Sequence, residues 1–389
     1  MGILNKQFIN TTPEQLLLQI SDVRKKLRSK NLSPSEKLSL ANYLGNLYAA
    51  IICLGYDVNF DIKECFGGTK NYNKFIRKID YYSCKMVDNF VFNKEFHKDN
   101  LFNIITETEE EKCMLKDIDD IDVNFSRSDF FELFNQFMKS IGKDKLFDYM
   151  YKNHHIYSTK VGYDKGNAGF TVFNPIDSIP DVFISNFKYD LRSMNTLAHE
   201  LGHCDDLLSF DGDIESFNKY FYMSFYNECI SKLYELLLNN FLSSSGIDKD
   251  IVDSKRIDFH LTNFEFLLEA YILSLLSCSY ILEGKYLDQN TNEIVEMIGK
   301  NFTDEDYIKF FIDNMINLDI AEIYNYAYGG IVSLFLYDDV LKNGFDSKLM
   351  NSFMKERINL FNPDVYNDLG FSSDRYVRLY KKDVSDLIK

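Results

Sequence analysis

Proline and glycine are scarce in this chain, and that scarcity limits the folds open to it. The 389 residues include 5 Pro and 18 Gly, so few positions interrupt a helix. Two helix starts can be read directly. Thr12 caps a segment with Pro13 at its first helical position, and Ser33 forms a capping box with Glu36 around Pro34. We therefore predict a mainly α-helical fold, with further helices over "SRSDFFELFNQFMKSIG" and "SKLMNSFMKERINLF".

One region breaks this helical pattern. Residues 156–187 contain Gly, Pro and runs of β-branched or aromatic residues. They predict short strands near 169–173 and 181–187, joined by a turn around Asn174–Pro180. The acidic stretch 107–122 predicts a solvated face or loop.

Composition limits the classes of protein to be considered. Hydrophobic residues make up 46% and charged residues 26% of the chain, which is typical of globular proteins. The N-terminus lacks a signal-peptide pattern, so a cytoplasmic location is expected. The formal net charge of −16 argues against nucleic acid or an anionic membrane as partner. Seven scattered Cys without a CxxC pair favour reduced thiols over disulfides or a cysteine zinc site.

The stretch "TLAHELGH", residues 196–203, contains a possible metal site. His199 and His203 are four residues apart and would share a helix face. Glu200 would reach a water molecule on the same ion, which is the HExxH arrangement of two zinc ligands and a general base. The alternative is a helix that carries two histidines by chance.

A catalytic zinc ion needs a third protein ligand. Asp206 and Ser209 stand where a metzincin would need Gly and His, which excludes that class. Glu228 is the one carboxylate in the first half of a predicted apolar helix over 218–242. A nearby cation would offset the cost of burying it, although such a Glu can also lie at the solvent edge. Glu235 could hydrogen bond to a ligand histidine and orient it.

This pattern resembles the thimet oligopeptidase and oligoendopeptidase F family of zinc peptidases. The family places a Glu 25 residues after the second His, and here 228 − 203 = 25. Its E-x-x-S-x-x-x-E pattern matches Glu228, Ser231 and Glu235. Its Gly-containing strand, edge strand and Tyr-rich stretch ending in a small-residue turn correspond to "GNAGFTVF", "DVFISNF" and "EIYNYAYGG". These segments lie in order between about residues 150 and 340.

The resemblance implies a mainly α, zincin-type fold with the small β-sheet beside the HExxH helix and helical lobes on either side of a substrate channel. We expect an N-terminal helical lobe over 1–150 and a catalytic lobe over 151–389. Family members are usually longer, so a shallower channel is expected here. The stretch before the Tyr run lacks the family's His. The oxyanion role is therefore assigned to Tyr324, Tyr326 and Tyr328, with aromatic core as the alternative for each.

The implied activity is that of a zinc-dependent endopeptidase acting on oligopeptides. One Zn²⁺ per chain would be held by His199, His203 and Glu228, and Glu200 would activate a zinc-bound water. Strand 181–187 is expected to pair with the peptide substrate through four residues: Phe183, Ile184, Ser185 and Asn186. The alternatives are a processing protease for one leader or signalling peptide and an inactive peptide-binding protein. The other histidines are expected to be structural or exposed: His97, His154, His155 and His260.

Overall fold

The computed structural model describes most of the chain between residues 12 and 388. Three predicted features lie outside the described residues: 116–122 of the acidic stretch, 175–178 of the predicted turn, and 218–225 of the predicted apolar helix. The described ranges are 12–29, 32–33, 36–37, 39–41, 43–45, 47, 94–115, 123–159, 169–174, 179–210, 226–275, 320–360 and 362–388.

Contacts within the chain define two compact units, and each combines two separate stretches of sequence. The first unit holds the described residues of 1–80 and 122–217, and the second holds those of 81–121 and 218–389. The contacts therefore divide the chain differently from the predicted lobes 1–150 and 151–389. The reason is that α4 (Lys94–Met114) packs on two C-terminal helices of the second unit, which sequence order alone does not reveal.

Helix α1 of the first unit spans Pro13–Leu27 and begins where the sequence predicts. Thr12 Oγ1 accepts a hydrogen bond from the Gln15 backbone N–H at 3.3 Å, and Gln15 Oε1 accepts one from the Thr12 N–H at 3.0 Å. The second predicted box is also present, with Glu36 Oε2 2.8 Å from the Ser33 backbone nitrogen. Such pairs satisfy N–H groups that the first helical turn leaves without partners. Both predicted helix starts are confirmed.

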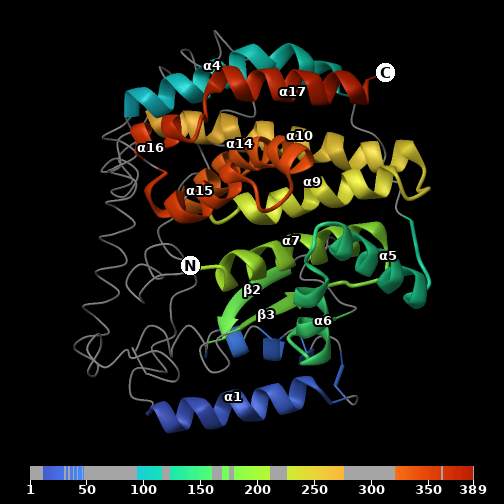
Figure 1. Ribbon diagram of the computed structural model, residues 1–389. Coiled ribbons are helices and arrows are strands. Elements are labelled where there is room, and N and C mark those ends of the chain that lie inside the picture. Colours follow the sequence, from blue (N-terminus) through green and yellow to red (C-terminus); the bar gives the residue numbers. More distant parts are fainter. Residues whose placement is uncertain are drawn as a thin grey trace, which may run out of the picture. The chain divides into compact units, whose positions relative to one another are not determined.

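A three-stranded sheet lies at the centre of the first unit (Figure 1). Its strands are β1 (Ile156–Ser158), β2 (Gly169–Asn174) and β3 (Ile179–Ile184), in the order β1-β3-β2. β1 runs parallel to β3, and β2 runs antiparallel to it with Phe170 opposite Phe183. The prediction of a small sheet between residues 156 and 187 is confirmed.

The predicted position of the third strand within the sheet was wrong. The sequence indicated an edge strand over 181–187, whereas β3 begins at Ile179, ends at Ile184 and is hydrogen bonded on both sides. The predicted turn also began too early and ended too late, because Asn174 and Pro180 both lie in strands. Residues 180–184 are buried. A short apolar run of this kind suits a strand buried on both faces, and its neighbours cannot be read from its own residues.

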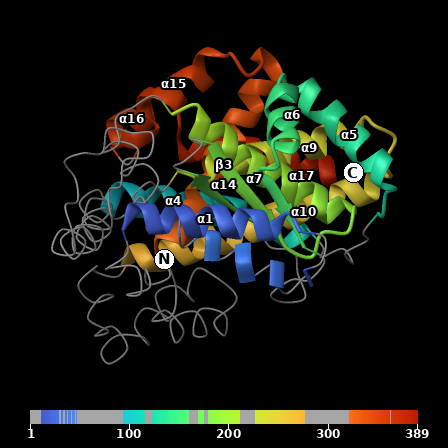
Figure 2. The same cartoon turned by 90° about the horizontal axis from the view of Figure 1, so that it is seen from below.

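Helices cover both faces of this sheet. Helix α7 (Leu191–Leu208) packs on β2 and β3, while α1 lies on the opposite side (Figures 1 and 2). Helix α5 (Arg127–Ser140), which was predicted, is capped by Ser126 and precedes α6 (Asp144–Lys152). The HExxH sequence is therefore presented by a helix that rests directly on the sheet.

The second unit is entirely helical in its described part. α9 (Cys229–Ser243) and α10 (Lys249–Leu275) both pack against α14 (Ile320–Asn343), while α4 packs against α10 and α17 (Ser373–Leu387). The shorter elements are α15 (Lys348–Glu356), the 3₁₀ turn η4 (Arg357–Asn359) and α16 (Pro363–Asp368). The prediction of a mainly α-helical protein is confirmed. No helix formed by the described residues is long and apolar enough to cross a membrane.

Candidate metal centre

The first turn of α7 is fixed by several hydrogen bonds. Asp190 Oδ1 accepts one from the Ser193 backbone N–H at 2.7 Å, and Ser193 Oγ accepts one from the Lys188 N–H at 3.1 Å. The chain enters the helix through Asn186 and Tyr189, whose φ angles are 54° and 56°. Residues other than glycine adopt this left-handed region infrequently. The two hydrogen bonds stabilise this uncommon backbone turn, and the turn fixes where α7, which carries the HELGH residues, begins.

His199 and His203 lie on one face of α7, as their spacing predicts. Their Nε2 atoms are 3.1 Å apart, and the rings meet edge to face with centroids 4.8 Å apart. Both side chains are half-buried. The structure thus brings together two imidazole nitrogens, each of which can donate a lone pair to one ion when its ring is neutral.

Glu200 is 3% exposed and has a defined partner on the sheet. Thr171 of β2 donates its hydroxyl proton to Glu200 Oε2, with the oxygens 2.6 Å apart. Gly169 leaves the space for this carboxylate, because a Cβ there would lie 2.8 Å from both Cγ and Cδ of Glu200. The sequence analysis identified the Gly-containing strand but did not identify Thr171 as a partner of Glu200. The position of Thr171 within that strand was the available indication of this role.

Glu228 belongs to the second unit and directly precedes α9 as its N-cap residue. The predicted helix over 218–242 included Glu228, whereas α9 begins at Cys229 and Glu228 lies just before it. The side chain is 8% exposed, and its Oε2 accepts a hydrogen bond from Ser231 Oγ at 3.0 Å. A Cβ on Gly329 of α14 would lie 2.5 Å from Glu228 Cβ. Glu228 is therefore buried against a helix that approaches closely only because residue 329 is glycine.

The two glycines that follow the Tyr run were expected to form a turn, and this expectation was wrong. Gly329 and Gly330 lie inside α14, which continues to Asn343. Their role is close packing, since a Cβ on Gly330 would overlap the Asn263 side chain of α10. The packing on α9 and α10 outweighs the cost of glycine in a helix, which is about 1 kcal/mol each.

Lys232 is a buried cation that sequence reasoning missed. It lies one turn after Glu228 on α9 and is 5% exposed. Its Nζ is 5.1 Å from the ring centroids of both Phe259 and Tyr326, within range of a cation–π interaction. Burial lowers the pKa of Lys232, and Glu235 and Glu228 act in the opposite direction. A lysine within an otherwise apolar run, close in sequence to two carboxylates, was the available signal.

The three tyrosines of α14 occupy different environments. Tyr324 and Tyr328 are 2% and 1% exposed, whereas Tyr326 is partly exposed. The Tyr328 ring packs edge to face on Tyr226 and Tyr366, and burial raises its pKa. The aromatic-core alternative therefore describes Tyr328, and Tyr326 is the most accessible of the three.

The residues expected to bind a peptide strand do not offer a free backbone edge. Val182 N–H donates to the His155 carbonyl at 2.8 Å, and the Ile184 carbonyl accepts from Thr159 N–H at 2.9 Å. Phe183 is paired with β1 on one side and β2 on the other. Pairing of a substrate with β3 is therefore excluded. Ser185 and Asn186 follow the strand, and Ser185 is buried.

The histidines outside α7 have the structural or exposed roles expected of them, as far as they are described. His155 Nδ1 is 2.7 Å from Asp181 Oδ1, and His260 Nε2 is 2.7 Å from Asp383 Oδ2. Both histidines are buried, while His154 is exposed. The side chain of His97 lies outside the described residues.

Comparison with known proteins gives one structural likeness. No protein-family model matches the chain, and no curated protein sequence matches it. The chain is similar to the crystal structure of a protein described as a "putative peptidase" from Chlamydophila abortus, with a TM-score of 0.52 and 16% sequence identity. The likeness covers 96% of this chain and 64% of that chain. The two proteins therefore share a fold, and this chain spans less than two thirds of the other's length.

Proposed function

We propose that this chain is a zinc-dependent endopeptidase of the zincin type that hydrolyses peptide bonds in oligopeptides. The separation of 3.1 Å between the His199 and His203 Nε2 atoms carries the proposal. Two nitrogens bound to one tetrahedral zinc ion at about 2.0–2.1 Å would lie roughly 3.3 Å apart. The imidazole pair thus fits a zinc ion without rearrangement. The fold shared with a protein described as a peptidase supports the general class.

Glu228 is the proposed third ligand. It lies 228 − 203 = 25 residues after the second histidine, which is the spacing found in the zinc peptidase family that this sequence resembles. Its burial also favours this role, because a buried carboxylate needs a compensating cation or strong hydrogen bonds. Two His and one Glu form the ligand set of several catalytic zinc sites. Glu235 is proposed to orient a ligand histidine.

The residues around the proposed site would divide the reaction between them. A bound zinc ion supplies a Lewis acid that polarises the scissile carbonyl and makes water more acidic. Glu200 accepts a proton from the attacking water and delivers it to the leaving amine. Thr171 holds the Glu200 carboxylate in one orientation through the 2.6 Å hydrogen bond. A tyrosine hydroxyl of α14 hydrogen bonds to the oxyanion, and the exposure of Tyr326 favours it over Tyr328.

The proposed peptide path follows β2 instead of β3. Among the described strands, β2 is paired on one side, with β3. A peptide that adds to its other side by β-augmentation would run beside Thr171, and so beside the carboxylate that Thr171 holds. A peptide on this edge of β2 would therefore lie near Glu200, the proposed general base, because Thr171 of β2 is hydrogen bonded to it.

A digest of a mixed peptide library, read by mass spectrometry, tests the proposed function. The wild-type protein should cut many peptides, and a chelator should stop the cutting. Glu200→Gln should cut at least about 10²-fold more slowly, because it removes the general base, while it keeps its zinc content. Cleavage of one sequence alone would favour a processing protease. Peptide binding without any cleavage by the wild type would refute the peptidase proposal.

A further inference from the structure

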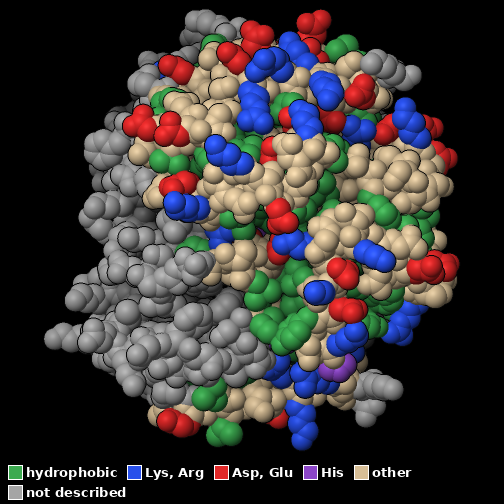
Figure 3. Space-filling model, in the orientation of Figure 1, with side chains coloured by type: hydrophobic (Ala, Val, Ile, Leu, Met, Phe, Trp, Pro, Cys, Tyr) green, Lys and Arg blue, Asp and Glu red, His purple; other side chains and the backbone are tan. Residues whose placement is uncertain are grey.

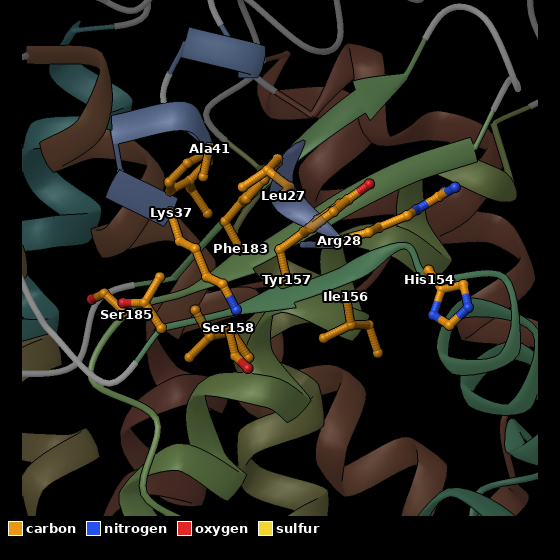
Figure 4. A pocket seen from close by; sticks show the side chains of 13 residues that line it. Leu27, Arg28, Lys37, Ala41, His154, Ile156, Tyr157, Ser158, Phe183 and Ser185 are labelled. Carbon is orange, nitrogen blue, oxygen red and sulfur yellow. The ribbon is translucent and has the colours of Figure 1, made fainter. Parts of the chain in front are cut away.

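A cavity of about 400 Å³ lies in the first unit, on the side of the sheet where α1 is found. Its lining includes a stack of three aromatic rings, one from each strand, and Figure 4 labels two of these residues, Tyr157 and Phe183. Tyr157 of β1 lies 5.0 Å from Phe183 of β3, and Phe183 lies 4.8 Å from Phe170 of β2, with interplanar angles of 13° and 22°. Leu27 and Ala41 complete an apolar wall. The volume is in the range of cavities that hold small organic molecules.

The polar groups that line this cavity are basic or hydroxylic. Arg28, Lys37 and His154 are on its lining, as are Ser158 and Ser185. Figure 4 shows Lys37 extending from its helical segment towards β1. No Asp or Glu is among the described lining residues. This is unusual in a chain with a net charge of −16, whose acidic and basic side chains are interspersed on the surface in Figure 3.

Two permanent cations, Lys37 and Arg28, are among the lining residues. Within the described part of the chain, neither Lys37 nor Arg28 forms a side-chain ion pair. By contrast, Lys26 of α1 pairs with Asp22 at 2.5 Å. Lys37 is also half-buried, and a cation held near an apolar surface attracts an anion more strongly than one in open water. Among the described residues, the cavity thus combines an apolar lining with two cations that form no side-chain ion pair.

His154, which is on the lining, has a backbone conformation that is unfavourable for residues other than glycine. It ends α6 with a φ of 61°. The His154 N–H donates to the Tyr151 carbonyl and the His155 N–H to the Met150 carbonyl at 2.9 Å. This is the Schellman ending, in which glycine is the usual residue at the left-handed position. A histidine here is strained relative to glycine, and it places an imidazole at the cavity.

We propose that this cavity binds a small molecule that has an apolar body and one anionic head group, such as a carboxylate or sulfonate. The body lies on the Tyr157–Phe183–Phe170 stack, and the head group is attracted by the positive charges of Lys37 and Arg28, whose side chains extend to different sides of the cavity in Figure 4. The site is separate from the proposed peptidase centre. Phe170 lines the cavity, whereas the adjacent Thr171 bonds to Glu200 of α7, and side chains of successive strand residues point to opposite faces.

Two fluorescent probes with the same aromatic body test the proposal. 8-Anilinonaphthalene-1-sulfonate carries the anionic group, and N-phenyl-1-naphthylamine lacks it. Titration of the full chain should give one site per chain, with the sulfonate bound at least about tenfold more tightly, a difference worth roughly 1.4 kcal/mol. Arg28→Gln combined with Lys37→Gln should remove this difference. Lys25→Gln is the matched control, because Lys25 is an exposed lysine in the last turn of α1 that does not line the cavity.

A third variant tests the location. Ala41 lines the cavity from a helical segment, and leucine suits a helix almost as well as alanine does, so Ala41→Leu should fold and should weaken binding of both probes. Equal affinity of the wild type for the two probes would overturn the proposal. So would undiminished sulfonate binding by the double variant or by Ala41→Leu. None of these outcomes depends on peptidase activity, so they leave the proposed function untouched.

Discussion

Gly169 gives the space in which the Glu200 carboxylate lies, so Gly169→Ala should displace the proposed general base. The added Cβ would be 2.8 Å from Glu200 Cγ and Cδ and closer still to Oε1, whereas ordinary contact begins at 3.4 Å. The carboxylate must therefore move by 3.4 − 2.8 = 0.6 Å or more, and a displacement on the order of 1 Å costs about 10²-fold in rate. We expect kcat to fall by about that factor, or roughly 2.7 kcal/mol.

The assay compares steady-state cleavage of one fluorogenic peptide, zinc content and melting temperature. Gly45→Ala is the matched control. Its Cβ would meet Val172 and Phe170 of the same strand β2 at 3.6 and 3.8 Å, which is ordinary contact. This control should keep full activity and an equal or higher melting temperature, because alanine suits a helix better than glycine does. If folded Gly169→Ala cleaves within about threefold of the wild-type rate, the position assigned to Glu200 in catalysis is wrong.

Three further predictions separate the roles of residues near the proposed site. Thr171→Val should lower kcat by about tenfold or more, since it removes a hydrogen bond to a charged group, and Thr171→Ser should recover most of the rate. Glu228→Gln should weaken zinc binding more than Glu235→Gln, whose effect should be about 10–100-fold; the reverse order would make Glu235 the ligand. Tyr326→Phe should slow cleavage at unchanged melting temperature, while Tyr328→Phe should leave cleavage almost unchanged; a larger rate loss in Tyr328→Phe would contradict this assignment.

The parts of the site that depend on local periodicity could be predicted from the sequence. The positions of His199, Glu200 and His203 follow from the 3.6-residue helical repeat, and the caps at Thr12 and Ser33 follow from the needs of the first helical turn. The buried run before α7 was also recognised as a strand. These features are set by residues within a few positions of one another, so no tertiary information was needed.

The parts that depend on distant partners could not be predicted. β3 became a central strand because β1, more than 20 residues earlier, pairs with its second edge, and nothing within β3 encodes that neighbour. Gly329 and Gly330 resembled a turn because glycine usually interrupts a helix. They remain helical because Glu228 and Asn263 approach them closely. In each case a contact made far along the chain outweighed the local preference.

Metal analysis of the purified protein tests the central claim most directly. Zinc should be measured by mass spectrometry in the wild type, in His203→Ala and in His154→Ala, the last as a control at an exposed histidine outside α7. We predict about one zinc ion per chain in the wild type and in His154→Ala, and a small fraction of that in His203→Ala, because a site with two protein ligands binds zinc weakly. A wild-type protein that binds no zinc when zinc is supplied, or a His203→Ala variant that retains one ion per chain, would contradict the proposed metal centre.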